Sequence, residues 1–136
     1  SINNINREST GSFLYPVVVY SCYFMSDLLE AKIYFYIPIL ILAVADPFAA
    51  LFGKKWPSGK YTILGHSKTL VGSTAFFVCS LITVTITFWL NGFLVYQIIP
   101  IIFFLALSTT MVEAISHKGY DNLTIPGIAL LILMFL

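Results

Sequence analysis

Long apolar runs separated by short charged islands constrain the fold of this chain more than any other feature. The segments 70–90 and 94–115 contain a single charged residue between them, Glu113, near the end of the second run. About 20 apolar residues in a helix are enough to cross a bilayer. Only 10% of the chain is charged and 59% is hydrophobic, and its mean hydropathy is +0.93. Soluble domains carry about 25% charged residues, so we expect an integral membrane protein.

The apolar runs predict an all-α, multi-pass transmembrane bundle, because backbone groups in lipid must be hydrogen-bonded within their own segment. We expect about five membrane segments, at roughly 13–25, 33–52, 70–90, 94–115 and 123–136. The last would rise only about 21 Å as a helix, against a hydrocarbon core of about 30 Å. Residues 1–136 are predicted to form a single membrane-embedded domain, either complete or the carboxyl-terminal part of a longer protein.

The lysines predict which side of the membrane each loop occupies. Four of them lie between the second and third segments: Lys54, Lys55, Lys60 and Lys68. The positive-inside rule places this loop in the cytoplasm. Five segments then put Arg7 and Lys118 on the same side and leave Lys32 outside. We expect a protein of the cell membrane or of an endoplasmic-reticulum-type membrane, and no nucleic-acid partner.

Asp46 is the strongest single signal of function. A carboxylate inside a spanning segment costs about 2.5–3.5 kcal/mol on insertion scales, so it should face protein, water or a cation. Pro47 follows it and leaves the carbonyl of Ala43 without its usual helical donor. We therefore predict a kinked helix beside a polar cavity.

Small residues share the predicted helix face of Asp46. Ala49, Ala50 and Gly53 follow it at i+3, i+4 and i+7. Such a face either packs closely against another helix or admits a ligand. Helix packing alone does not explain the aspartate.

A second group of polar residues lies near the last loop. Glu113 has Thr109 and Thr110 one helical turn earlier, and it is either a second carboxylate of the site or a solvated interfacial residue. Two carboxylates with substrate phosphates are a usual arrangement for Mg²⁺. Asp121 and Asn122 are either a helix cap or contacts to a metal and a ribose.

The segment 67–73 leads into the third apolar run, where backbone N–H groups and the helix dipole favour an anion. Lys68 adds a positive charge to this segment. A Thr69 cap beside a lysine that extends to the interface would give the same pattern. No Walker A, GxSxG or HExxH pattern is present. His66 and His117 lack paired ligands, and we expect both to be polar loop residues.

Two spaced motifs, DPFAALFG and SKTLVGS, resemble the D-x-x-A-x-x-x-G and K-T-x-x-G runs of the CTP-dependent polyprenol and lipid kinases. VEAI, YDNLTIP and GSFLYP resemble further signatures of this group, which includes dolichol, phytol and diacylglycerol kinases and is related to membrane cytidylyltransferases. Val71 and Ser67 depart from the dolichol kinase pattern, which has glutamate and lysine there. The match therefore favours the phytol or diacylglycerol type.

The resemblance implies a phosphotransferase that uses CTP and Mg²⁺ to phosphorylate a membrane lipid alcohol. The catalytic residues would be Asp46, Lys68, Glu113 and Asp121, with Asp46 and Glu113 as the metal ligands. The nucleotide site would comprise Ala49, Gly53, Lys68, Thr69, Gly72, Ser73 and Asn122. The sequence does not divide the roles of metal ligand and base among the acids.

Two alternatives to the kinase stay open. One is a phosphatidate cytidylyltransferase, which would transfer CMP to the lipid, and the other is a non-catalytic membrane subunit of the same fold. Family members usually carry further amino-terminal helices. Such helices or a homo-oligomer would complete the assembly.

Overall fold

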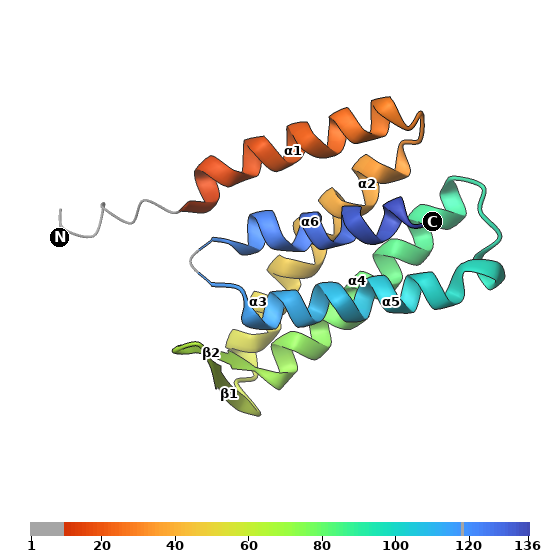
Figure 1. The fold of residues 1–136 in the computed structure, drawn as a ribbon. Coiled ribbons are helices and arrows are strands. Elements are labelled where there is room, and N and C mark those ends of the chain that lie inside the picture. The colour runs from red at the N-terminus through yellow and green to blue at the C-terminus, as the bar shows by residue number, and fades with distance from the viewer. Residues whose placement is uncertain (1–9, 118) are drawn as a thin grey trace.

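The computed structural model describes residues 10–117 and 119–136, which form a helical bundle with one small hairpin (Figure 1). Predictions that involve Arg7 and Lys118 fall outside these residues. The elements are α1 (Thr10–Leu28), α2 (Ile33–Leu40), η2 (Ile41–Ala45), α3 (Asp46–Lys55), β1 (Lys60–Ile63), β2 (His66–Thr69), α4 (Leu70–Leu90), α5 (Val95–Ile115) and α6 (Asp121–Met134).

Three helices in the described part of the chain are long and apolar enough to cross a membrane, judged by length and composition. They are Ile33–Lys55, Leu70–Leu90 and Val95–Ile115, close to three of the predicted segments. This confirms a helical membrane bundle. Asp121–Met134 is a shorter apolar helix, and the membrane placement of α1 and α6 stays a prediction.

The second span changes its helical pattern just before Asp46. Ile41–Ala45 form a turn of π-helix between α2 and α3. Pro47 cannot donate a backbone hydrogen bond to Ala43, so regular α-helical bonding cannot continue through this point. Short π-helical turns often occur at functional sites. The irregularity lies where the sequence predicted a kink.

The lysine-bearing segment between α3 and α4 is a β-hairpin rather than the simple loop that the sequence predicted. Strands β1 and β2 pair antiparallel, with Ile63 opposite His66. Leu64 and Gly65 form the two-residue turn, with φ of 51° and 79°. Positive φ at both turn positions is typical of a type I′ turn.

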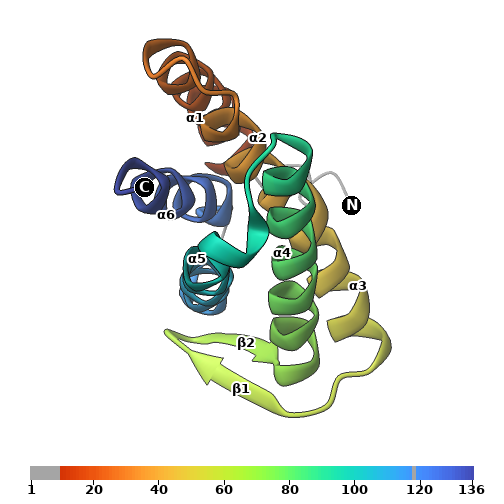
Figure 2. The same cartoon turned by 90° about the vertical axis from the view of Figure 1, so that its right-hand side faces the viewer.

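Helix α4 lies at the centre of the bundle, between the α2–α3 span on one side and α5 on the other (Figure 2). Phe76 and Phe88 of α4 are fully buried, as are Ile37 of α2, Leu105 of α5 and Ile125 of α6. Helix α1 packs on α2 and α6. In a bilayer this close packing replaces the hydrophobic effect as the main attraction between helices.

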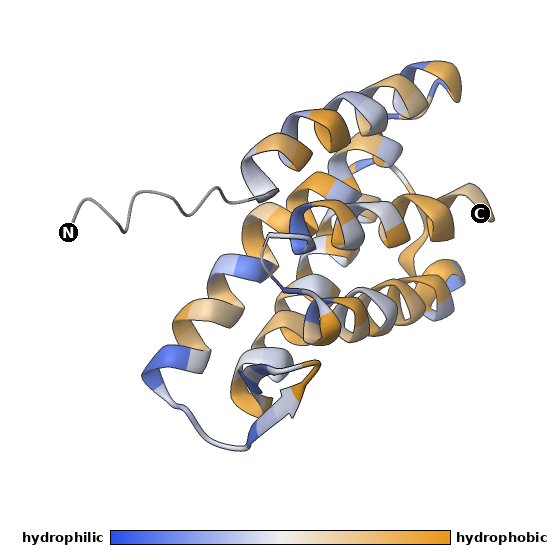
Figure 3. Ribbon diagram, turned by 60° about the vertical axis from the view of Figure 1, so that its left-hand side comes forward, coloured by the Kyte–Doolittle hydropathy of each residue, from blue (hydrophilic) through white to orange (hydrophobic). Residues whose placement is uncertain are grey.

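The connections sort to the two ends of the bundle (Figure 1). The hairpin and the α5–α6 connection lie at one end, and the α1–α2 and α4–α5 connections lie at the other. Figure 3 shows apolar residues along most of the helices and hydrophilic residues on α3 and around the hairpin. The lysine-bearing loop and the last loop therefore share one side, as five segments require.

Candidate active site

A polar pocket of about 380 Å³ lies at the hairpin end of the bundle. It is lined by Asp46, Ala49, Ala50, Gly53, Lys54, Ser67, Lys68, Thr69, Gly72, Ser73, Glu113 and Asp121. Every site residue predicted from the sequence is in this set except Asn122. Four helices and the second strand of the hairpin contribute to it.

Asp46 lines this pocket from the first position of α3. Its carboxylate lies within electrostatic range of Asp121, Glu113 and Lys68. The acid therefore faces polar protein groups, as expected for a charged residue at membrane depth. Asp46 directly follows η2, so this π-helical turn determines where the residue lies.

Glu113 is buried, with 5% of its surface exposed, which rules out a solvated interfacial residue. Lys68 donates from Nζ to Glu113 Oε1 and to the backbone carbonyl of Glu113, the latter at 2.8 Å. The second carboxylate oxygen, Oε2, is buried and has no hydrogen-bond partner in the described chain. Buried polar atoms are almost always paired, so this oxygen indicates a missing ligand.

The pocket can accommodate a divalent cation. Its three carboxylates face two lysines, Lys54 and Lys68, so the lining keeps a net negative charge. Among the described residues, no group of three or more His, Cys, Asp and Glu could hold a metal ion by itself. Mg²⁺ needs only one or two carboxylates when substrate phosphates and water complete its shell. The donor set therefore fits Mg²⁺ bound together with a nucleotide.

Two glycines bring α3 and α4 close together beneath the pocket. A Cβ atom on Gly72 would lie 3.0 Å from the carbonyl oxygen of Ala49, and one on Gly53 would lie 2.9 Å from Thr69 Oγ1. Both distances are too short for an unstrained contact. The small residues that share a face with Asp46 therefore serve helix packing as well as lining the pocket.

The start of α4 is capped by its own chain. Thr69 Oγ1 accepts a hydrogen bond from the Gly72 N–H at 3.1 Å, and the Leu70 N–H donates to the Gly59 carbonyl at 3.0 Å. The Thr69 cap, which the sequence left open as an alternative, is therefore present. The side chains of Lys68, Lys54 and Ser73 remain as the cationic and hydroxyl groups for an anion.

No sequence motif predicted a part in the site for Tyr61. Its hydroxyl lies 2.6 Å from Ser73 Oγ and ties β1 to the pocket wall. His66 stacks on His117 with ring centroids 4.4 Å apart, which ties the hairpin to the α5–α6 connection. The available sequence signal for the hairpin was the pair of short segments KYTI and HSKT on either side of Leu64 and Gly65. The turn lacks the Asn or Asp that usually marks such hairpins.

Three predicted neighbours of the site do not line the pocket. Thr109 and Thr110 donate to carbonyls one turn earlier on α5, including that of Ala106. Asn122 lies beside Gly11 of α1, where a Cβ on the glycine would collide with its side-chain nitrogen. The nucleotide contact of Asn122 stays a prediction.

The sequence is 30% identical over 127 residues to a phytol kinase of Synechocystis sp., a match that covers 93% of this chain and 54% of the relative. The chain thus spans about half the length of the curated relative it matches. No protein-family model and no solved structure matches it. The match supports, at the level of the family, the resemblance to lipid kinases that the sequence motifs indicate.

Proposed function

We propose that this chain carries the phosphoryl-transfer site of a membrane lipid kinase, which uses CTP and Mg²⁺ to phosphorylate a lipid alcohol at the cytoplasmic face. The observation that carries the proposal is the pocket itself. Asp46, Glu113 and Asp121 meet Lys68 there, and a buried oxygen of Glu113 has no partner. The phytol kinase relative supports the same class of reaction.

In this proposal Asp46 and Glu113 hold the metal, and Lys68 binds the nucleotide phosphates. Mg²⁺, when bound, would neutralise charge on the phosphates. Lys68 is already directed into the pocket by its contacts with Glu113. Those contacts use two of the three N–H donors of Lys68, so one donor stays available for a nucleotide phosphate.

Asp121 is then the base. The lipid hydroxyl attacks the γ-phosphorus of CTP, a new P–O bond forms to the alcohol, and the bond between the γ-phosphorus and the bridging oxygen breaks. The hydroxyl proton passes to the Asp121 carboxylate, and CDP leaves. Oδ1 of Asp121 accepts the Asn122 N–H at 3.0 Å, which orients the carboxylate at the start of α6. Catalysis rests mainly on positioning and charge.

The substrate is a membrane-resident alcohol of the phytol, polyprenol or diacylglycerol type. It enters from the bilayer, and its hydroxyl meets the nucleotide at the membrane surface. The phytol kinase relative favours a prenyl alcohol among these.

Isotope transfer tests the proposal. Vesicles containing the chain are supplied with lipid alcohol, Mg²⁺ and CTP labelled at either the α- or the γ-phosphate, and the product lipid is identified by mass. Label from the γ position in the lipid is expected. Label from the α position identifies a cytidylyltransferase instead. No transfer and no nucleotide binding, with cellular activity unchanged by Asp46→Asn, identifies a non-catalytic subunit.

A further inference from the structure

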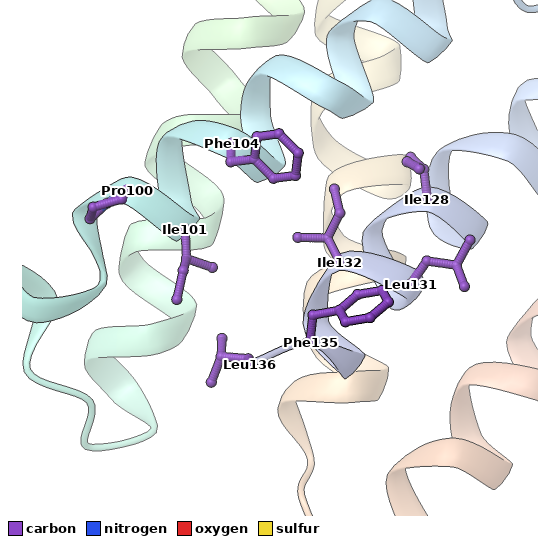
Figure 4. A pocket seen from close by; sticks show the side chains of 8 residues that line it. All are labelled: Pro100, Ile101, Phe104, Ile128, Leu131, Ile132, Phe135 and Leu136. Carbon is purple, nitrogen blue, oxygen red and sulfur yellow. The ribbon is translucent and has the colours of Figure 1, made fainter.

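Two apolar cavities lie between α5 and α6. One has a volume of about 760 Å³ and is lined by residues that include Ile101, Phe104 and Phe135. Figure 4 shows Ile101 and Phe104 of α5 across a gap from Ile128, Leu131 and Ile132 of α6. The other, of about 480 Å³, begins at the α5–α6 connection. Both volumes are typical of ligand pockets.

The two cavities form one groove, because Ile128 and Leu131 line both of them. The groove follows α6 from Thr124 to Phe135. At 1.5 Å per residue this is about 16 Å. One leaflet of a bilayer with a core of about 30 Å has nearly the same depth. A single hydrocarbon chain could therefore lie in the groove from the membrane surface to the midplane.

Gly127 leaves this groove open. A Cβ atom at this position would meet nothing within 4 Å, and the residue lies within α6. Glycine inside a helix costs about 1 kcal/mol relative to alanine. Neither helix packing nor a left-handed backbone requires glycine here, in contrast to the close contact at Gly72. The position borders the open space of the groove.

The mouth of the groove lies at the same end of the bundle as the polar pocket (Figure 1). Ser116, His117 and Tyr120 line the mouth, while Glu113 and Asp121, at the two ends of the same short connection, line the pocket. A hydroxyl that emerges from the groove therefore reaches the end of the bundle at which the polar pocket lies. Most of the groove beyond it is hydrocarbon, which suits a chain rather than a headgroup.

We propose that the α5–α6 groove binds the single hydrocarbon chain of the alcohol whose hydroxyl reacts in the polar pocket. The inference rests on the proposed function and adds to it where the hydrocarbon part of the substrate binds and that it is a single chain. One groove of one leaflet's depth accepts the single chain of a prenyl or fatty alcohol.

Filling the groove tests this directly. A Cβ at Gly127 would meet nothing within 4 Å, so we expect Gly127→Leu to fold while it fills part of the groove. For geranylgeraniol the variant is expected to raise KM on the order of tenfold, since single groups in apolar pockets contribute that much. For prenol, which is too short to occupy the groove, kcat/KM is expected to match that of the unchanged chain. Ile86→Phe, on the exposed face of α4, is the matched control and should alter neither. An unchanged KM for geranylgeraniol in Gly127→Leu overturns the proposal that the groove binds the hydrocarbon chain.

A second measurement does not depend on turnover. The chain in phospholipid vesicles is cross-linked with geranylgeraniol that bears a diazirine at the end of its tail, and labelled peptides are located by mass spectrometry. Labelling near Ile101 and Phe135, at the far end of the groove, is expected, reduced by excess unlabelled alcohol but not by excess phospholipid. Labelling spread over all lipid-facing helices overturns the proposal. Specific labelling in a chain that transfers no phosphate retains the groove and rejects the kinase.

Discussion

Two spans of nearly equal length and apolarity serve different purposes in this bundle. Ile33–Lys55 has 23 residues and Leu70–Leu90 has 21, with similar mean hydropathy. The second is one continuous α-helix at the centre of the bundle. The first contains a π-helical turn and presents Asp46 to the polar pocket directly after it. Interrupted backbone, more than hydropathy, distinguishes the span that builds the site.

Polar residues in these spans differ in the same way. Thr85 and Thr87 of α4 donate to carbonyls of their own helix at 2.7 Å. Ser80 is buried with no partner in the described chain. The two threonine hydroxyls need no ligand or neighbouring helix, whereas the carboxylates of Asp46 and Glu113 converge with Lys68 from separate elements. A polar residue in a span indicates function only when other elements bring partners to it.

Asp46→Asn should give the largest effect. The amide keeps the size of the side chain but removes the charge proposed to hold the metal, so we expect kcat/KM to fall on the order of 10²-fold or more. Phosphate transfer to lipid measures it. Ser80→Ala is the matched control in α4, and removing an unpaired buried hydroxyl should leave activity within about twofold and stability equal or higher. Equal losses in both variants would abolish the distinction between the two spans.

Lys68→Met should have the next largest effect. It leaves buried Glu113 without its cation, so we expect the free energy of unfolding to fall by about 2 kcal/mol, with nucleotide KM raised on the order of tenfold. Thermal unfolding in micelles and nucleotide titration measure the two effects. Adding Glu113→Gln removes the unpaired charge and should restore stability without restoring activity. Recovery of both would contradict the role given to Lys68.

Gly72→Ala probes the contact between the two spans. Its Cβ would press on the carbonyl oxygen of Ala49 at 3.0 Å, so we expect a loss of about 1–3 kcal/mol in the free energy of unfolding. Gly127→Ala, where space is open, should instead gain about 0.4–1 kcal/mol. Thermal unfolding compares the pair. The same sign of change in both would show that α3 and α4 are not held at this distance.

Tyr61→Phe should give the smallest effect. It removes the hydroxyl that lies 2.6 Å from Ser73 Oγ and with it about 0.5–1.5 kcal/mol. We expect a few-fold rise in nucleotide KM with kcat nearly unchanged, because Tyr61 positions the pocket wall rather than contacting reacting atoms. Tyr96→Phe, on the exposed surface of α5, should change neither constant. A fall in kcat alone would mean that Tyr61 has another role.

The local sequence determined the helices and the position of the break. Long uncharged runs force helical backbone in lipid, and Pro47 removes a helical donor wherever it stands, so both followed from neighbouring residues. Asp46 was identifiable because a buried charge is costly in any membrane fold. The hairpin was harder to foresee, since Leu64 and Gly65 form a type I′ turn without its usual residues.

Only the tertiary structure decided how the polar residues combine. The sequence could not show that Lys68 pairs with Glu113, 45 positions away, or that Asn122 turns to Gly11 while Asp121 enters the pocket. The sequence placed Gly72 in a motif, but it could not show that Gly72 borders a carbonyl oxygen while Gly127 borders open space. Such contacts depend on how helices cross and rotate against one another, and that is set by packing across the whole bundle.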